Sequence, residues 1–444
     1  MFGKKDFLDS ELKLSYSKSG ASHVLAVSGL HVGVIFVFLN FLFSLFIRGN
    51  KTGFRLARVS FVLVFLWSFA FLTGGSASVL RSALMFSFFQ FAFLFQRPFY
   101  AYASLFSSMF LLIVWEPQLL FNVGFQLSYA AVLSILFFQP KIAALFSPAN
   151  KFLAWTWNLT SVSLAAQIGT APLVLYYFHQ FSFLFWLSAL VVMPLATALI
   201  ALTGLTLLTY RVSCVCDFFA FLLDKVAIAM NFCVESINHI PFSSASDLYC
   251  PLICVFLIFV AILLFALYCS IRRPFALILS LVSVLLMLSF SILDYELKTS
   301  KSTFAVYYLP GVSAVNAFSF RDNVVKTDNL DKVSRKANDF WLASYAPATP
   351  VIDSVGVFSI GGRKAFVLSK VPEENFSYPE CPVAVDYLVV SRNVKIEKDV
   401  LSRIFAYKRL IIDSSCSSST AQWWLSRYHK GYVVMERGSF VEQF

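Results

Sequence analysis

The sequence predicts a polytopic all-α membrane domain followed by a small soluble α/β domain. Of its 444 residues, 59% are hydrophobic and only 13% are charged, whereas soluble domains carry about 25% charged residues. Up to residue 297 the chain contains repeated apolar runs, long enough as helices to cross a bilayer core about 30 Å thick. From Lys298 onward, polar and apolar residues alternate as in a soluble domain. The composition excludes a wholly soluble protein, and we expect domains at 23–297 and 298–444.

Residues 1–22 are expected to form an amphipathic lead-in, since Leu8, Leu12 and Tyr16 recur at helical spacing. We expect no cleavable signal peptide, because this stretch is polar and the next apolar run is too long. Residues 214–238 are ambiguous as a span because they carry three acids and Lys225, so the domain has nine or ten helices. The other predicted spans are 24–47, 56–73, 77–95, 99–115, 119–138, 153–178, 182–210, 249–271 and 275–293.

The loop charges predict the orientation of these spans. With alternating spans, one side receives most of the basic loop residues: Arg48, Lys51, Arg55, Arg58, Arg97, Lys141, Lys151 and Arg211. Basic loops stay in the cytoplasm, so Met1 lies outside. If 214–238 crosses, Arg272 and Arg273 also lie inside and residues 298–444 lie outside, which is the topology we favour. If 214–238 lies on the surface, the C-terminal domain is inside.

The eight cysteines predict no zinc site, because their spacings match no zinc motif. The six in membrane runs are read as buried, inert thiols. Cys381 and Cys416 could pair if the C-terminal domain is outside the cytoplasm, and the sequence leaves this open.

The first apolar run opens with an unusual number of polar and small residues. His23, Ser28 and His31 lie in its first third, and polar groups within a span usually face a water-filled cavity or a partner helix. Gly29 and Gly33 are four residues apart, a spacing that lets another helix approach closely. The alternative is ordinary helix packing with histidines near the interface. We also expect Gly74, Gly75 and Gly124 to serve helix packing, although the first two form a turn signal.

Polar residues of three separate spans are predicted to lie at one depth. His31, Arg81 and Gln126 each fall four to seven residues into spans that run from outside to inside, which places them roughly 6–12 Å below the outer surface. Together they would line a hydrated cavity that opens outward, and Gln167 would extend its lining. Alternatively, Arg81 reaches the outer headgroups and Gln167 bonds a neighbouring helix.

Three stretches of the membrane region resemble the signature of the ComEC-type competence protein family. They are H-V-L-A-V-S-G-L-H-V-G at 23–33, L-R-S-A-L-M at 80–85 and N-V-G-F-Q-L-S-Y-A-A-V-L at 122–133. The resemblance implies a channel in the bacterial inner membrane that admits single-stranded DNA during natural transformation. In it, Arg81 and neutral donors would shield the phosphates from hydrocarbon.

The resemblance also implies partners. Besides single-stranded DNA and membrane lipid, these are a DNA receptor and a cytoplasmic motor. Family members usually carry an oligonucleotide-binding module before the signature, which here begins at residue 23. We therefore expect an N-terminally truncated chain, or a module encoded separately.

The C-terminal domain resembles a degenerate metallo-β-lactamase fold. Strands are expected at 303–308, 365–368, 387–390, 410–412 and 432–435. In hydrolases of this type, a strand ends in a cluster of His and Asp ligands that holds two metals. Here the strand through Asp386 runs into Ser391-Arg392-Asn393, and His429 is the one histidine in the domain. We therefore expect no enzyme activity, catalytic residue, metal or cofactor, and we read Asp386 and Asp413 as surface or capping residues.

Two other function classes remain open. A membrane-anchored hydrolase would need a set of ligands, yet residues 22–138 contain one acid, Glu116. A secondary transporter for a small anion would also use broken helices and polar groups within the membrane, although no inverted repeat is visible.

Overall fold

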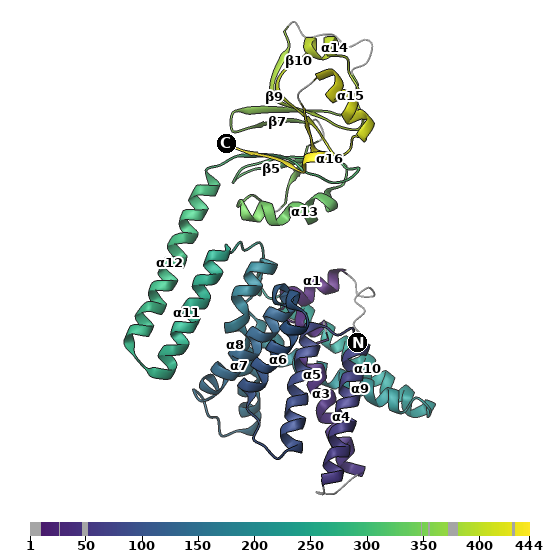
Figure 1. The fold of residues 1–444 in the computed structure, drawn as a ribbon, viewed down its shortest axis with the longest axis vertical. Coiled ribbons are helices and arrows are strands. Elements are labelled where there is room, and N and C mark those ends of the chain that lie inside the picture. The colour runs from purple at the N-terminus through teal and green to yellow at the C-terminus, as the bar shows by residue number, and fades with distance from the viewer. Residues whose placement is uncertain are drawn as a thin grey trace. The chain divides into compact units, whose positions relative to one another are not determined.

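The computed structural model divides the chain into two compact units, Met1–Leu286 and Met287–Phe444. It describes residues 10–25, 27–46, 52–347, 349–353, 356–371, 381–428 and 431–444. Residues 1–9 of the predicted lead-in, together with Arg48, Lys51 and His429, lie outside the described residues. Apart from one short two-stranded pairing the first unit is helical, whereas the second is built from both strands and helices (Figure 1).

The helices of the first unit follow the apolar runs of the sequence. They are α1 (Ser10–Lys18), α2 (Ser22–Leu25), α3 (Gly29–Phe46), α4 (Thr52–Leu72), α5 (Ala77–Leu94), α6 (Ala101–Trp115), α7 (Val123–Ala143), α8 (Lys151–Phe178), α9 (Phe185–Leu208), α10 (Ser213–Asn238), α11 (Leu252–Ile271) and α12 (Pro274–Thr299), which continues into the second unit. Among the described residues, seven helices are long and apolar enough to span a bilayer: α4, α5, α7, α8, α9, α11 and α12. The chain is therefore a multi-pass membrane protein, as predicted.

Two predicted spans differ in detail from the structure. The span 24–47 is divided into α2 and α3, because the Ser28 backbone N–H donates to the His31 ring and caps a new helix at Gly29. The span 119–138 starts instead with a 3₁₀ turn, Pro117–Phe121, before α7. The ambiguous stretch 214–238 lies in one continuous helix, α10, which is not among the seven apolar helices. Whether it crosses the membrane stays a prediction.

Glycine allows the closest approach between α7 and α8, which lie side by side (Figure 1). A Cβ atom at Gly169 would lie 2.6 Å from both the Ala130 carbonyl oxygen and the Ser134 Cβ. Across the same contact, the Ser134 hydroxyl donates to the Ala165 carbonyl oxygen at 2.5 Å. This close helix pairing therefore depends on the absence of a side chain at Gly169.

The predicted packing glycines behave in two ways. Gly29 and Gly33 both face α5, where added Cβ atoms would lie 2.7 Å from Ser82 Oγ and 3.6 Å from Phe86. The packing prediction is wrong for Gly74, where an added Cβ would meet nothing within 4 Å, and Gly74 and Gly75 instead supply the positive φ of the α4–α5 turn. Gly124 meets only the Asn122 side chain that caps its own helix.

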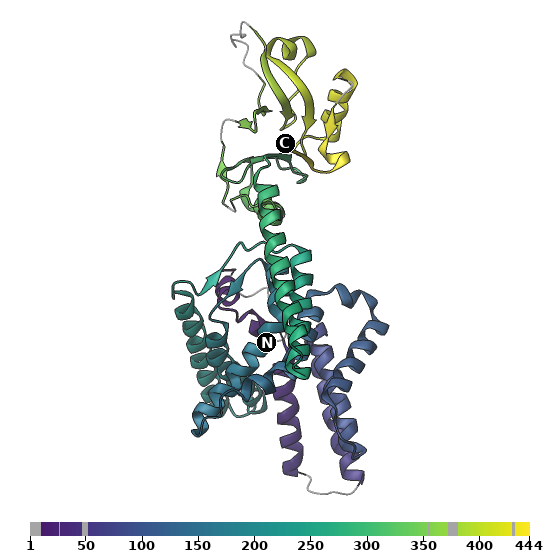
Figure 2. The ribbon, with the colours of Figure 1, turned by 90° about the vertical axis from the view of Figure 1, so that its left-hand side faces the viewer.

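The second unit packs two five-stranded sheets face to face. One has the order β12-β3-β4-β5-β6 and the other β11-β10-β9-β8-β7 (Figures 1 and 2). The strands are β3 (Thr303–Val306), β4 (Ala314–Phe318), β5 (Asn323–Thr327), β6 (Val351–Ile352), β7 (Val357–Ile360), β8 (Arg363–Leu368), β9 (Val383–Val390), β10 (Phe405–Ile412), β11 (Tyr432–Val433) and β12 (Phe440–Gln443). Helices α13 (Leu330–Ala343), α14 (Lys398–Ile404) and α15 (Ser418–Tyr428) pack on the outer faces and give a helix–sheet–sheet–helix sandwich. The prediction of a helical membrane region followed by an α/β domain is confirmed.

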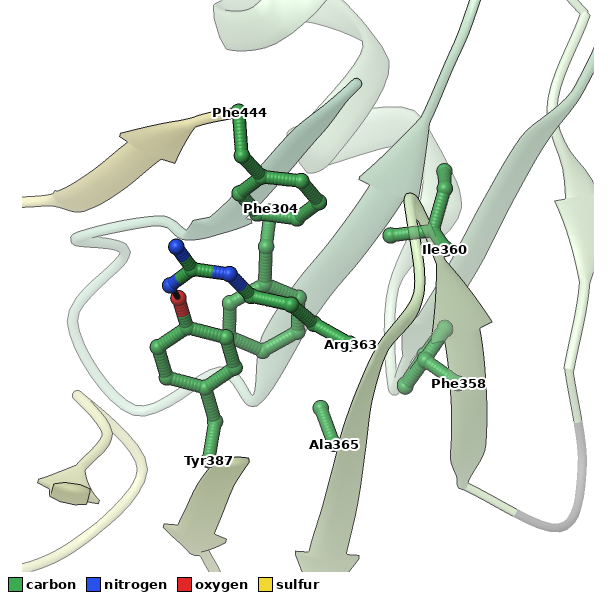
Figure 3. Close-up of a pocket in the computed structure, with 7 residues that line it drawn as sticks. All are labelled: Phe304, Phe358, Ile360, Arg363, Ala365, Tyr387 and Phe444. Atoms are coloured by element: carbon green, nitrogen blue, oxygen red, sulfur yellow. Dashed lines mark hydrogen bonds between the residues drawn. The ribbon is translucent and has the colours of Figure 1, made fainter. Parts of the chain in front are cut away.

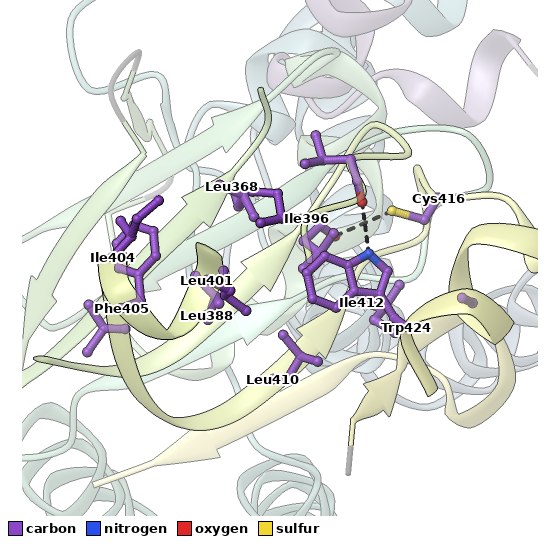
Figure 4. Packing of buried hydrophobic residues seen from close by; sticks show 14 of the residues in the cluster. Leu368, Leu388, Ile396, Leu401, Ile404, Phe405, Leu410, Ile412, Cys416 and Trp424 are labelled. Atoms are coloured by element: carbon purple, nitrogen blue, oxygen red, sulfur yellow. Dashed lines mark hydrogen bonds between the residues drawn. The ribbon is translucent and has the colours of Figure 1, made fainter. Parts of the chain in front are cut away.

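Alternating side chains of β9 serve two cores. Tyr387 and Val389 face the other sheet, whereas Leu388 and Val390 face α14 and α15. In the outer core, Trp424 Nε1 donates to the Val394 carbonyl oxygen at 2.8 Å (Figure 4). At an edge of the inner core, the Arg363 guanidinium bonds the Tyr387 hydroxyl at 2.6 Å, and its Cζ lies 4.7 Å from the Phe444 ring centroid (Figure 3).

The predicted strands fall on observed ones except at 432–435, where Val434–Arg437 turn into the short helix α16. Both cysteines of the domain are free thiols, Cys381 exposed and Cys416 buried, so the structure does not pair them. Burial raises the pKa of the Cys416 thiol to about 12. Of the six cysteines predicted to be buried in the membrane unit, Cys254 is buried, four are half-buried and Cys214 is exposed, so the prediction is wrong for Cys214.

Asp413, at the end of β10, is fully buried, so of the two predicted roles the surface one is wrong, whereas its contact with the Ser415 backbone N–H fits the capping one. Its Oδ1 accepts from the backbone N–H and the hydroxyl of Ser415, but its Oδ2 has no partner among the described residues. Burial, the largest cause, raises the carboxyl pKa of Asp413. Asp386 is half-buried and accepts from Lys408 Nζ at 2.7 Å and from the Lys364 backbone N–H at 2.9 Å, contacts that lower its pKa.

We expect Gly169→Ala to lower the free energy of unfolding by about 1–3 kcal/mol, since the methyl group would meet backbone on α7. Gly204→Ala is the matched control, because a Cβ at Gly204 in α9 would meet nothing within 4 Å. Thermal unfolding of the two variants in the same detergent measures the difference. Equal unfolding midpoints would contradict the close pairing of α7 and α8.

We expect Asp413→Asn to stabilise the protein by about 1 kcal/mol at pH 7, because a neutral amide replaces a buried carboxylate. The raised pKa of Asp413 means that its contribution to stability is full below the ordinary carboxyl pKa. That contribution is lost as pH rises through the raised pKa. The advantage of the variant should therefore shrink as pH falls toward 4.

Asp386→Asn is the opposite control for this pH series. The lowered pKa of Asp386 gives stability that is present above the ordinary carboxyl pKa and is lost on acidification. Unfolding midpoints across pH 4–8 decide between the two behaviours. An Asp413→Asn advantage that is independent of pH would show that the carboxyl group does not titrate as inferred.

Candidate functional site

Arg81, in the second turn of α5, is a buried cation without an acidic partner. Its side chain is 7% exposed, and among the described residues it forms no ion pair. Glu116, the one acid in residues 22–138, is exposed. Because burying a charge in an apolar environment is costly unless it is compensated, the surroundings of this guanidinium decide what it does.

Serine and tyrosine side chains from neighbouring helices surround one side of the Arg81 guanidinium. Its Nε donates to Ser128 Oγ on α7 at 2.7 Å, and Ser128 in turn donates to Ser78 Oγ at 3.1 Å. The Cζ lies 5.9 Å from the ring centroid of Tyr129, which is a cation–π contact. The Tyr129 hydroxyl bonds Ser108 Oγ on α6 at 3.0 Å. Neutral groups therefore hold the cation and leave its charge unneutralised.

The other side of the guanidinium lies against the first turn of α3. A Cβ at Gly29 would lie 2.9 Å from Arg81 Nη2, so a side chain here would require the guanidinium to shift. Nη2 has no hydrogen bond to any described residue. The first backbone N–H groups of a helix carry partial positive charge and suit an anion. A cation and a helix start at one place form an arrangement that an anionic group would complement.

Ser28 and His31 form the cap of the same helix. The Ser28 backbone N–H donates to His31 Nδ1 at 3.3 Å, and Ser28 Oγ lies 3.1 Å from the same nitrogen. The ring thus takes the place of the glutamate in a capping box, and in its neutral form Nε2 carries the proton. His31 is 8% exposed and Arg81 7%, so helices enclose both side chains in this structure. Whether they line a hydrated cavity stays a prediction.

The remaining predicted residues make no hydrogen bond to Arg81 among the described residues. His23 is exposed in α2. Gln126 donates to the Leu120 carbonyl oxygen at 2.9 Å and accepts from the Tyr177 hydroxyl of α8 at 2.9 Å. Gln167 is half-buried in α8 and has no hydrogen bond to any described residue. The structure therefore places Arg81 beside Gly29, the first residue of the helix that Ser28 and His31 cap, and gives no hydrogen bond from Arg81 to the other three.

Sequence reasoning missed the serines and the tyrosine around Arg81. Ser128 and Tyr129 lie inside the stretch 122–133, and Ser78 lies three residues before Arg81 on the same helix face. That spacing could have identified Ser78. Serine is common in apolar helices, however, and no local pattern joins Arg81 to a residue 47 positions later.

The described residues contain no group of three or more His, Cys, Asp or Glu side chains placed to hold a metal ion. At the end of β9, where hydrolase ligands would be expected, Arg392 forms an ion pair with Asp328. Its backbone N–H donates to Ser415 Oγ at 2.7 Å. The residues present at this edge therefore form an ion pair and a hydrogen-bond network with one another.

Comparison with known proteins finds similarity along most of the chain. Residues 1–272 match the family described as "Competence protein", and residues 304–440 match the "ComEC C-terminal domain". ComE operon protein 3 of Bacillus subtilis (strain 168) is 34% identical over 214 residues, which is 48% of this chain and 26% of that protein. An uncharacterized protein of Aquifex aeolicus (strain VF5) is 34% identical over 213 residues, or 47% of this chain and 46% of that protein.

The matched segments thus span about a quarter and about half of these curated relatives. No solved structure matches. Since the family match covers more than half of the chain and includes α3, α5 and α7, the protein belongs to the competence protein family.

Proposed function

We propose that this protein is a channel that carries single-stranded DNA across the bacterial inner membrane during natural transformation. The observation that carries the proposal is the enclosed Arg81 guanidinium, which is held by serines and has no carboxylate partner in the described chain. Membership of the competence protein family supports it. The whole protein's substrate and partners are part of the proposal.

The chemistry of Arg81 fits a phosphodiester strand. A strand that crosses a bilayer must exchange the water around each phosphate for protein donors, and a guanidinium offers several N–H groups in a planar fork. An internal ion pair would occupy that fork, whereas Nη2 has no hydrogen-bond partner among the described residues. Ser78, Ser82 and Ser128 supply neutral hydroxyls nearby, so the strand is contacted without being bound too tightly to move.

The surroundings of the channel complete the proposal. By the positive-inside rule the basic loops favour Met1 outside the cytoplasm, and we propose that α10 crosses, so that the C-terminal domain lies outside as well. The strand would reach the channel from a DNA receptor, with a separate oligonucleotide-binding module, and would be drawn inward by a cytoplasmic motor.

For the C-terminal domain we propose a metallo-β-lactamase-like fold without hydrolase activity. The helix–sheet–sheet–helix layering supports the resemblance. Two of its carboxylates form ion pairs, Asp328 with Arg392 and Asp386 with Lys408, which leaves Asp413 alone at the end of β10. One carboxylate does not supply the several ligands that two metals need, and the described residues contain no such group.

A transporter for a small anion is the second candidate, because one guanidinium at a helix start can hold a single anionic group. The two candidates differ in their cargo. Uptake of phosphate or sulfate into liposomes by the purified protein, without DNA dependence, would favour the transporter.

We expect Arg81→Gln to lower transformation by about 100-fold, since removing hydrogen bonds to a charged group costs about 3 kcal/mol at the point of passage. Arg97→Gln, which changes an exposed arginine just beyond α5, is the control and should transform normally. Transformants are counted at matched membrane levels of both variants. Normal transformation by Arg81→Gln would overturn the proposed role.

We expect purified full-length protein to leave labelled single-stranded DNA intact in the presence of Mg²⁺, Mn²⁺ or Zn²⁺. Gel analysis of the strand after incubation, with and without chelator, measures this. Degradation that depends on an added metal, and that Asp328→Asn abolishes, would establish a hydrolase and contradict the proposal.

A further inference from the structure

A second polar cluster joins α3, α4 and α5 near the ends opposite to the Arg81 site. Asn40 of α3 accepts at its Oδ1 from Arg58 Nε at 3.1 Å, from Arg58 Nη2 at 3.0 Å and from Gln90 Nε2 at 3.1 Å. Its Nδ2 donates to the Phe36 carbonyl oxygen at 2.8 Å. Arg58 Cζ lies 4.8 Å from the ring centroid of Phe93. This cluster lies within the membrane unit and is separate from the site of Arg81.

Within the cluster, the hydrogen-bond donors and acceptors do not match in number, and the charge of Arg58 is not neutralised. Three N–H donors converge on one oxygen, which has two lone pairs. Gln90 is 1% exposed, yet its Oε1 has no hydrogen-bond partner among the described residues. Arg58 is half-buried and forms no ion pair in the described chain, and its Nη1 makes no hydrogen bond there. The cluster therefore holds a positive charge and has both a donor and an acceptor left unused.

The two arginine sites are joined by one helix seam. Gly29 of α3 faces Arg81 and Ser82 of α5, and eleven residues later Asn40 faces Gln90. Eleven residues of helix rise about 16 Å. Between them, Phe36 stacks on Phe86 with ring centroids 4.4 Å apart. The α3–α5 seam thus has a cation near each end and aromatic rings between.

We propose that Arg58, with Asn40 and Gln90, is a second contact for the transported strand, after Arg81 on its way through the membrane. The inference rests on the proposed function. A nucleotide supplies what the cluster lacks: phosphate oxygens accept from Arg58, and base N–H groups donate to Gln90 Oε1. Phosphate and sulfate offer chiefly acceptors, so this cluster favours a nucleic acid over a small anion.

The competing explanation is a structural latch, in which the Arg58 fork only ties α4 to α3. Two substitutions separate the explanations because they act in opposite directions. Asn40→Asp gives Arg58 a carboxylate, which strengthens a latch but neutralises a strand contact. Arg58→Lys keeps the charge but loses the pair of hydrogen bonds to Asn40 Oδ1. This loss weakens a latch more than it weakens a phosphate contact.

The experiment measures transformation and entry of labelled DNA for Asn40→Asp, Arg58→Gln, Arg58→Lys and Arg81→Gln. Membrane levels and unfolding midpoints in detergent are compared for all four. We expect Asn40→Asp and Arg58→Gln to lower transformation about 10-fold or more, a factor that corresponds to about 1.4 kcal/mol. Transformation by Arg58→Lys should stay within a few-fold of that of the unaltered protein. If Asn40→Asp lowers the unfolding midpoint, its transformation cannot be compared directly. The comparison of Arg58→Lys with Arg58→Gln then decides between the strand contact and the latch.

Normal transformation by Asn40→Asp, or an Arg58→Lys variant as impaired as Arg58→Gln, would establish the latch and overturn the second contact. If either result came with a defective Arg81→Gln, the proposed channel would stand without this second site. If Arg81→Gln and Arg58→Gln both transformed normally, the proposed function would fail together with the inference.

Discussion

The arrangement of the membrane unit depends on the burial of one guanidinium without a carboxylate. Arg81 is 7% exposed, and its hydrogen bonds within the described chain go to neutral groups. Such a charge persists in an apolar surrounding only where dipoles and ring faces are arranged around it. Ser128, Ser78 and Tyr129 supply these dipoles and the ring face. Gly29 leaves space for the guanidinium because it has no side chain. The contacts of the Arg81 side chain therefore join the first turns of α3, α5 and α7.

Charges in the second unit are handled differently. Glu442 accepts from Arg363 at 2.9 Å and from Arg409 at 2.7 Å, Asp328 pairs with Arg392, and Asp386 pairs with Lys408. These are partly exposed ion pairs, which contribute modestly to stability and leave little unused capacity. Arg81 and Arg58 have no such partners in the described chain. The contrast is that neutral groups, not carboxylates, contact the buried Arg81 and the half-buried Arg58 within the described chain.

The sequence was sufficient to predict the helices of the membrane unit, because long apolar runs bounded by Pro and Gly leave few alternatives in a membrane. The helices of the C-terminal domain, α13 to α15, were not predicted. It did not reveal the break at Ser28, where the histidine ring takes the role usually played by glutamate in a helix cap. Several strands were missed because they are short or carry polar residues. Asn316 lies in the middle of β4, yet it is fully buried and bonded to Tyr307, Asn323 and Trp341.

The candidate site was predictable only in part. Arg81 stood out as a lone charge in an apolar run, and its neighbours did not, since their partners come from other helices. Gln126 was expected at the same depth and does lie at the start of α7, but it bonds Tyr177 and Leu120 instead of joining the arginine. Depth along a helix follows from counting residues, whereas the direction of a side chain depends on how the helices pack.

The most direct measurement of the central claim is photo-crosslinking to a strand in transit. Azidophenylalanine replaces Tyr129, whose ring lies beside Arg81, and cells take up labelled DNA under illumination. The account predicts a crosslink between the full-length protein and a single strand, and its loss when Arg81 is also changed to Gln. Normal DNA uptake with no crosslink at position 129 would show that the strand does not pass the Arg81 site.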